Sequence, residues 1–144
     1  MRHRTVRDVM NDNGVCQQPP GASVRAACRA MTEHRCGSVL VVEGDRLVGI
    51  FTMRDAVERV FAQGRDPDLT FLAEVMTAEP DTIGPNERVD EAVRRMDEFG
   101  YRHLPVVDGQ RAVGVLSLRD LPIETLAAMH AELESRRAIA EHAW

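Results

Sequence analysis

Amphipathic stretches and short apolar runs follow one another along the chain in the same order twice. Apolar residues spaced i, i+3, i+4 and i+7 predict a helix over residues 23–34 and another over residues 89–99. Each helix precedes two apolar runs separated by a Gly-containing turn, a pattern that predicts a β-hairpin. The runs are residues 38–42 and 46–51 in the first half, and residues 103–107 and 111–116 in the second. A further helix is predicted after each hairpin, the first over residues 53–63.

The two halves of the chain are copies of one unit. At an offset of 65 residues, positions 20–55 align with positions 85–120 without a gap, and 14 of the 36 pairs are identical. Within this alignment the stretch GIFTMRD at residues 49–55 returns as GVLSLRD at residues 114–120. Each half therefore follows the order strand, helix, strand, strand, helix, which indicates a duplicated supersecondary unit.

One such unit buries too little apolar surface to fold alone, so we expect the two to pack face to face about a pseudo-twofold axis. The predicted fold class is α+β, with two β-α-β-β-α repeats that open on short extended runs at residues 15–17 and 81–83. We expect the repeats at residues 1–64 and 74–125, a linker at residues 65–73 and a C-terminal helix at residues 126–144. The linker is too short to separate independent domains.

The C-terminal helix is predicted to begin near Pro122 and to carry a modest apolar stripe. The stripe consists of Leu126, Met129, Leu133 and Ala140. It would cover part of this protomer or dock on a second copy, and a free apolar stripe favours association.

Charge and composition narrow the class of protein. The net charge is −5, and all 18 cationic side chains are Arg. Proteins that bind a nucleic-acid duplex are usually basic, so nucleic acid is disfavoured as the main partner. No apolar run approaches the length of a membrane span, and the N-terminus lacks the apolar core of a signal peptide. We therefore expect a cytoplasmic protein, with no membrane partner and with mostly reduced cysteines.

A hydroxyl residue and an Asp mark the point where each hairpin runs into its following helix. They are Thr52 with Asp55, and Ser117 with Asp120. One interpretation is helix capping, which stabilises the fold by about 1 kcal/mol and needs no ligand. The other is a binding site, in which phosphate meets Thr52, Ser117 and free N–H groups, and the Asp carboxylates accept ribose hydroxyls. Both roles are compatible with one side chain.

The two repeats differ in charge around the start of the second strand of the unit. The second repeat has Arg102 and His103 at this point, where the first has Gly37 and Ser38. Two cations would neutralise a polyphosphate, and the alternative is a solvated Arg beside an ordinary strand residue. Arg54 and Arg119 precede the two Asp residues, and each would either reach a phosphate or lie in water.

The three cysteines, with His34, raise the possibility of a metal or redox site. Cys28 falls on the apolar helix face, which indicates a core position. The chain has no C-x-x-C pair, so we expect no metal. Cys16 occupies the position equivalent to Thr82 in the opening extended runs, where it would contact a ligand. We find no nucleophile with a base and an orienting group, so we expect no enzymatic activity.

The order of these motifs resembles the cystathionine-β-synthase (CBS) domain, which occurs as a tandem pair called a Bateman module. The resemblance covers residues 5–125 and rests on two Val-Met openers, two Pro-led helices, the run Leu104–Asp108 and the two Gly-x-x-Thr/Ser-x-x-Asp turns. Length and linker are similar to the small stand-alone bacterial pairs, including the hypoxia- and stress-response type of actinobacteria. The first repeat has Leu40 in place of the usual Pro.

The resemblance implies a regulatory module that binds AMP, ADP, ATP or an adenosyl compound between the repeats and signals by a change of shape or stability. It also implies a homodimer formed through the helices and an unidentified regulated protein. The alternative is a ligand-free protein-interaction or redox-sensing module on the same fold. The expected ligand contacts are Thr52, Asp55, Ser117, Asp120, Arg102, His103, Pro105, Thr82, Cys16 and Val39.

Overall fold

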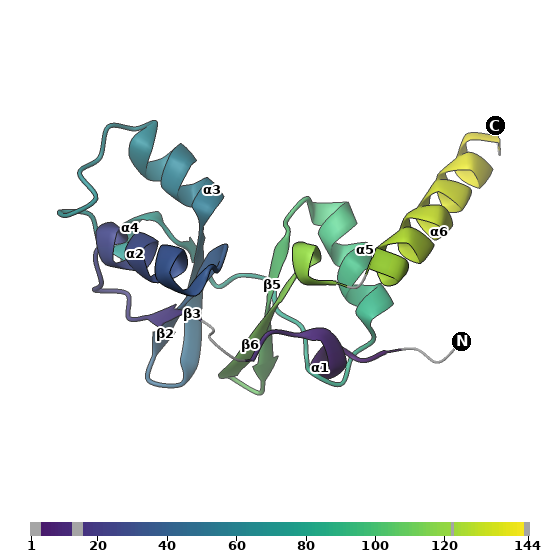
Figure 1. Ribbon diagram of the computed structural model, residues 1–144, viewed down its shortest axis with the longest axis horizontal. Helices are drawn as coiled ribbons and strands as arrows, with labels where there is room; N and C mark the ends of the chain where they lie inside the picture. Colours follow the sequence, from purple (N-terminus) through teal and green to yellow (C-terminus); the bar gives the residue numbers. More distant parts are fainter. Residues whose placement is uncertain (1–3, 13–15, 122, 143–144) are drawn as a thin grey trace.

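The computed structural model describes residues 4–12, 16–121 and 123–142, and it arranges them as two β-hairpins with helices packed on them (Figure 1). Within this part of the chain, six strands form one mixed sheet. They are β1 (Gln17–Gln18), β2 (Ser38–Glu43), β3 (Arg46–Thr52), β4 (Thr77–Ala78), β5 (His103–Asp108) and β6 (Arg111–Ser117). The order along the sheet is β1-β2-β3-β6-β5, and β4 pairs with β3.

Both predicted hairpins are confirmed, since β2 pairs with β3 and β5 with β6 in antiparallel register. The two hairpins join at their turn ends. Arg46 lies opposite Arg111, and the Ala112 N–H donates to the Asp45 carbonyl oxygen at 3.0 Å. From this junction the hairpins diverge (Figure 1). The ends at which β3 and β6 run into helical turns therefore lie away from the junction.

The helical elements follow the predicted order. They are α1 (Val6–Val9), α2 (Val24–His34), α3 (Met53–Asp55), η1 (Ala56–Phe61), α4 (Leu72–Val75), α5 (Val89–Phe99), η2 (Leu118–Asp120) and α6 (Ile123–His142). The long amphipathic helices are confirmed as α2 and α5. Ser23 caps α2, because its Oγ accepts the Ala26 N–H at 3.1 Å.

The helices after the two hairpins differ from each other. After the first, α3 continues directly into η1, a π-helix, so the predicted helix over residues 53–63 is present with an altered pitch. After the second, η2 is a single 3₁₀ turn, and Leu121 is extended before α6 begins. A proline at position 122 explains this break, because the residue before proline disfavours the α conformation. Of the predicted apolar stripe, only the Leu126 side chain falls within the described residues.

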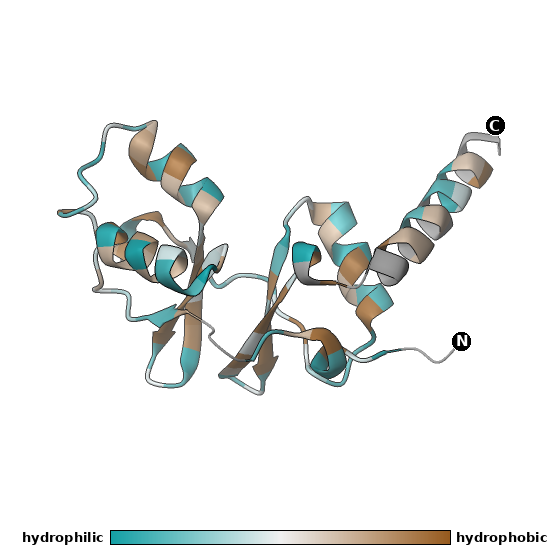
Figure 2. Cartoon of the chain, viewed as in Figure 1, coloured by the Kyte–Doolittle hydropathy of each residue, from teal (hydrophilic) through white to brown (hydrophobic). Residues whose placement is uncertain are grey.

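Apolar residues, coloured brown in Figure 2, occur along the strands and in parts of the helices. The first core consists of Cys16, Val24, Ala27, Met31, Val39, Val41, Phe51, Val60, Leu72 and Val75. The second consists of Val6, Ile83, Val89, Ala92, Val93, Met96, Leu104, Val106, Leu116 and Leu121. A third cluster on β2, β3 and β6 joins the two repeats through Leu40, Val42, Ile50 and Val115.

Each core is completed by a short helix from the other half of the chain. Val6 of α1 lies in the second core, and Leu72 and Val75 of α4 lie in the first. Backbone hydrogen bonds hold both helices in place, such as the Val6 N–H to the Glu87 carbonyl oxygen at 2.8 Å. The repeats therefore cannot separate without exposing apolar residues from both cores.

Among the residues that the structure describes, no helix is long and apolar enough to cross a lipid bilayer.

Candidate functional site

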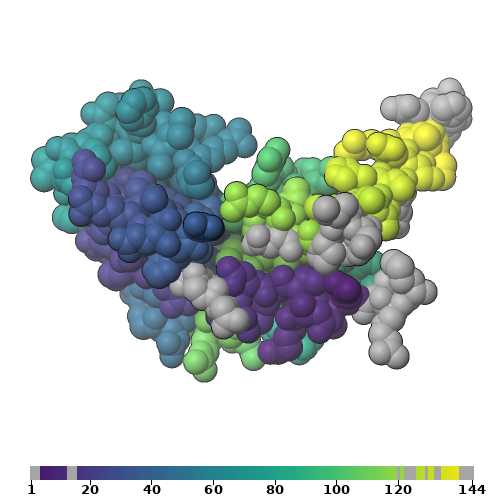
Figure 3. Space-filling model, in the orientation of Figure 1, coloured from purple at the N-terminus to yellow at the C-terminus, as the bar shows by residue number. Residues whose placement is uncertain are grey.

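A cleft of about 1060 Å³ lies between the two repeats, which stand side by side in the space-filling view (Figure 3). Its volume is slightly above the ~300–1,000 Å³ that is usual for small-molecule sites. The cleft is lined by Gly37, Ile50, Thr52–Asp55, Thr77, Glu79–Asp81, Gly100–His103, Ser117–Arg119, Leu126 and His130. Both repeats and the start of α6 thus face one space.

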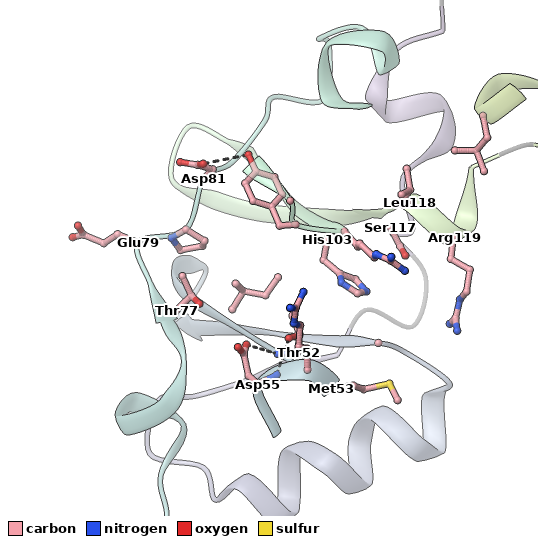
Figure 4. A pocket seen from close by; sticks show the side chains of 18 of the residues that line it. Thr52, Met53, Asp55, Thr77, Glu79, Asp81, His103, Ser117, Leu118 and Arg119 are labelled. Carbon is pink, nitrogen blue, oxygen red and sulfur yellow. Dashed lines mark hydrogen bonds between the residues drawn. The ribbon is translucent and has the colours of Figure 1, made fainter. Parts of the chain in front are cut away.

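The Thr52–Asp55 turn forms a closed cap at the edge of this cleft. The Thr52 hydroxyl oxygen accepts the Asp55 N–H at 3.1 Å, and Asp55 Oδ2 accepts the Thr52 N–H at 2.9 Å (Figure 4). Asp55 Oδ1 lies 3.5 Å from Arg59 Nε. The capping interpretation is therefore satisfied in this repeat, although a carboxylate offers about four acceptor positions and retains capacity for a ligand.

The corresponding turn of the second repeat is built differently. Ser117 is buried and lines the cleft, but its side chain makes no cap hydrogen bond to the turn that follows. The Leu118 N–H donates to the Arg102 carbonyl oxygen at 3.0 Å instead. The side chain of Asp120 lies outside the described residues, so its contact with the cleft stays a prediction. The duplicated sequence motif has thus diverged, because the Thr52 side chain caps its turn and the Ser117 side chain does not.

Charges in the cleft are separated along its length. Glu79 and Asp81 stand at one end in Figure 4, and Arg119 stands at the other. His103, one of the two predicted cations at the start of β5, projects between these ends. Arg102 also lines the cleft. An elongated ligand with an anionic end would therefore place that end toward Arg119.

His103 reaches across to the first repeat. A Cβ atom placed on Gly37 would come within 2.8 Å of His103 Nε2, so the absence of a side chain at Gly37 makes room for the imidazole. The Gly37 carbonyl oxygen also accepts the Met53 N–H at 3.1 Å, which ties this position to the Thr52–Asp55 turn. In the sequence, Gly37 stands out only as an uncharged counterpart of Arg102. Its packing against His103 was missed.

Tyr101 is a second lining residue that the sequence analysis did not select. Its hydroxyl donates to Asp81 Oδ2 at 3.2 Å, and its ring stacks on Phe99 with 6.0 Å between centroids. Burial, together with the nearby Asp81 carboxylate, raises the pKa of Tyr101 above its ordinary value. The phenol therefore remains a protonated donor at neutral pH. The sequence offered one signal for this residue, since Tyr101 directly precedes Arg102 and His103.

The model of the CBS domain matches the chain twice, at residues 19–62 and 72–121. The chain belongs to the CBS domain family. The predicted α+β class with two repeats is thereby confirmed, as is the resemblance to small tandem pairs.

Solved CBS proteins share the arrangement of most of the chain. CBS domain protein PAE2072 from Pyrobaculum aerophilum, complexed with AMP, superposes with a TM-score of 0.79 at 26% identity, covering 92% of this chain and 99% of that one. The CBS domain pair of protein MJ0100, in complex with 5′-methylthioadenosine and S-adenosyl-L-methionine, gives a TM-score of 0.77 at 25% identity. That match covers 88% of this chain and 98% of the other.

Relatives in sequence include one of similar length. CBS domain-containing protein YhcV of Bacillus subtilis is 34% identical over 123 residues, which are 85% of this chain and 86% of YhcV. Others are longer. The chain spans 62% of an uncharacterized protein of Methanopyrus kandleri and 22% of CBS domain-containing protein CBSCBSPB3 of Arabidopsis thaliana.

Four of the predicted ligand contacts lie away from the lining of this cleft. Cys16 and Val39 are in the core of the first CBS repeat, and Pro105 is fully buried in the second. Thr82 lies on the segment before α5, where its carbonyl oxygen accepts Arg95 Nη1 at 3.0 Å. Contact of these four residues with a ligand stays a prediction. In the described part of the chain, no group of three His, Cys, Asp or Glu side chains is placed to hold a metal ion.

Proposed function

We propose that this CBS pair is a regulatory module that binds an adenine nucleotide in the cleft between its repeats. The observation that supports this most is the separation of charge inside one nucleotide-sized space. A carboxylate at the Thr52–Asp55 turn faces the same space as Arg102, His103 and Arg119. A nucleotide combines neutral hydroxyls with an anionic phosphate, so it matches both walls at once.

The proposed roles follow from this arrangement. Asp55 caps its helix through Oδ2 and accepts a ribose hydroxyl with its remaining lone pairs. Arg102 and Arg119 bind the phosphate through charge-assisted hydrogen bonds. The ring of Tyr101, held by Asp81 and Phe99, offers a rigid aromatic surface beside the cations. Stacking on such a surface stabilises a bound base by about 1–3 kcal/mol.

Two solved relatives support the same ligand class. PAE2072 is complexed with AMP, and the MJ0100 pair with 5′-methylthioadenosine and S-adenosyl-L-methionine. These ligands share the adenosyl group and differ in charge. We infer that the cations of the present cleft favour phosphorylated members of this class. The repeats proper are proposed at residues 1–64 and 74–125, and the module acts in the cytoplasm, without catalysis, on a separate protein.

We also propose that two copies associate through the outer helices of the first repeat. Met53, Val57 and Phe61 are exposed at 58%, 60% and 85% on α3 and η1. Beside them a groove of about 590 Å³ runs between α2 and η1. A protruding aromatic ring next to an apolar groove on the same face is self-complementary, which is the requirement of a twofold interface.

A calorimetric and thermal-shift panel of adenosine, AMP, ADP, ATP and S-adenosylmethionine tests the nucleotide proposal. We expect at least one phosphorylated compound to bind and to raise the melting temperature. At about 100 times its dissociation constant, a ligand stabilises the fold by about 2.7 kcal/mol. If none of the five binds, the nucleotide proposal is wrong. The alternative of a ligand-free protein-interaction module would then be favoured.

Substitution of Arg102 tests how the phosphate is held. Arg102→Ala should weaken AMP by roughly 10-fold or more and leave adenosine nearly unchanged, because a hydrogen bond to a charged group contributes about 1.5–3 kcal/mol. Arg7→Ala, on the exposed face of α1, serves as the matched control. An equal loss for both compounds would show that Arg102 does not contact phosphate.

A further inference from the structure

Arg59 contacts the carboxylate of Asp55 from outside the cleft. Its Nε lies 3.5 Å from Asp55 Oδ1, and it is not among the residues that line the cleft. The two residues are four positions apart, at the point where α3 continues into the π-helix η1. Residues at this spacing are neighbours on a helix surface, and π-helical turns occur frequently at functional sites. The contact of Arg59 with the cleft is therefore indirect, through Asp55.

The other end of the Arg59 guanidinium holds the end of α4. Arg59 Nη1 donates to the carbonyl oxygens of Val75 at 3.0 Å and Met76 at 3.1 Å. These carbonyls belong to the last residue of α4 and to its C-cap, where the helix supplies no donors of its own. Thr77, the next residue, lines the cleft together with Asp55 (Figure 4). One planar group thus ties the Asp55 turn to the segment that carries Thr77.

Both oxygens of the Asp55 carboxylate are engaged. Oδ2 accepts the Thr52 N–H at 2.9 Å, and Oδ1 faces Arg59. With Oδ2 held alone, the carboxylate would be freer to rotate about its bond to Cβ, so the contact at Oδ1 restrains its plane. An ionised carboxylate has about four acceptor positions, which leaves about one on each oxygen. Two adjacent hydroxyls of a ribose supply two donors for these positions.

We propose that Arg59 is a positioning residue, which sets the plane of the Asp55 carboxylate and so makes the cleft select ribonucleotides over 2′-deoxyribonucleotides. This inference rests on the proposed nucleotide function. A 2′-deoxyribonucleotide has only one of the two adjacent hydroxyls, so one Asp55 oxygen would receive no donor from it. The Asp55 side chain is only 13% exposed, which limits the access of water to that oxygen.

Arg65 provides a matched control for Arg59. Its side chain is 43% exposed, against 46% for Arg59, and it also contacts α4, because Arg65 Nη1 lies 3.8 Å from Glu74 Oε1. Its ion pair is with Glu74 and not with Asp55. A comparison of the two arginines therefore separates an effect through Asp55 from the general loss of a cation beside α4.

Calorimetric titrations of the full-length chain test the proposal. AMP is compared with 2′-deoxy-AMP and ATP with 2′-deoxy-ATP, and the selectivity is the ratio of the two dissociation constants. The wild type should bind the ribonucleotide about 10-fold more tightly, as expected for one hydrogen bond to a charged group. Arg59→Gln should lose most of this ratio, chiefly through weaker binding of the ribonucleotide. Arg65→Gln should retain it.

The contrary outcomes can be told apart. If the wild type binds none of the four compounds, the nucleotide proposal is wrong as well. Equal binding of both members of each pair by the wild type would show that no hydroxyl is selected. Selectivity that is lost in Asp55→Asn but kept in Arg59→Gln would leave only the role of Arg59 wrong.

An equal loss of selectivity in Arg65→Gln would assign the effect to the cations beside α4 and overturn the role of the Asp55 contact. Arg59→Met keeps most of the length of the side chain and removes its charge. It repeats the test, with the same expected loss, if Arg59→Gln fails to fold.

Discussion

Asp55 shows how one side chain serves both stability and binding. Its Oδ2 completes the cap with Thr52, its Oδ1 faces Arg59, and the residue still lines the cleft. Capping and ribose binding are therefore not exclusive, because the carboxylate has more acceptor positions than the cap uses. The same cap occurs on α1, where Asp8 Oδ2 accepts the Thr5 N–H at 3.0 Å away from the cleft lining.

The pair Asp55→Asn and Asp8→Asn separates the two roles. Each variant should have a lower unfolding free energy than the wild type without ligand, because the amide loses the charge that faces the helix N-terminus. Only Asp55→Asn should also lose most of the AMP-induced rise in melting temperature, since one carboxylate oxygen becomes a donor. Thermal shifts with and without AMP measure both effects. A full AMP shift in Asp55→Asn would assign Asp55 to capping alone.

Gly37 sets the position of the His103 imidazole. In Gly37→Ala the new methyl group would meet His103 Nε2 at 2.8 Å, so the ring must move from its position at the cleft wall. We expect AMP affinity to fall about 10-fold, a change of about 1.4 kcal/mol, and the fold to be retained. Gly21→Ala is the control, because a Cβ there meets no atom within 4 Å. Unchanged affinity in Gly37→Ala, measured by calorimetry, would show that the imidazole position does not matter for binding.

At the scale of elements, α6 both contacts α5 and lines the cleft. Arg137 of α6 pairs with Asp97 of α5 at 3.1 Å, and Leu126 and His130 of α6 line the cleft. An exposed ion pair of this kind contributes only about 0–1 kcal/mol. This ion pair by itself therefore fixes the position of α6 only weakly.

Glu91 anchors the charge network of α5. Its carboxylate accepts hydrogen bonds from Arg94 and Arg95, which lower its pKa from 4.5 to about 2. A lowered pKa in the folded state contributes stability above pH 4.5 that is lost as the pH falls toward 2. The wild type should therefore be more stable than Glu91→Gln at pH 5, and the difference in unfolding free energy should shrink as the pH falls. Urea midpoints from pH 5 to 2.5 measure it, and parallel curves would contradict the assignment.

For the molecule as a whole, the exchanged helices α1 and α4 make the two repeats one cooperative body. Val6 completes the second core, and Leu72 with Val75 completes the first, so neither repeat holds its own opening helix. The cleft therefore has walls of fixed relative position, which preorganises it for a ligand. The exposed apolar residues of η1 are not buried by this packing, so they are available to a second copy.

Phe61→Asp tests the proposed association. A carboxylate placed in the apolar groove of the partner would be desolvated, so the variant should elute as a monomer where the wild type is dimeric. Ile139→Asp on α6, at a residue 69% exposed, is the matched control and should remain dimeric. Size-exclusion chromatography with light scattering measures both masses. Dissociation by Ile139→Asp alone would place the interface on α6.

The sequence by itself determined the elements and their duplication. Apolar runs on either side of a Gly-containing turn located both hairpins, and helical spacing located α2 and α5, because burial leaves a direct trace in the order of residues. The Thr52–Asp55 cap was also predictable from the sequence, since its two partners lie three residues apart. The break before α6 was not anticipated, although proline at position 122 was visible.

Tertiary structure decided which residues share a space. Tyr101, Glu79 and His130 joined the cleft only because divergent hairpins and α6 bring together segments far apart in the chain. Local periodicity records whether a side chain is buried but not against which partner, because the partner is set by packing of the two repeats and the exchange of α1 and α4 between their cores.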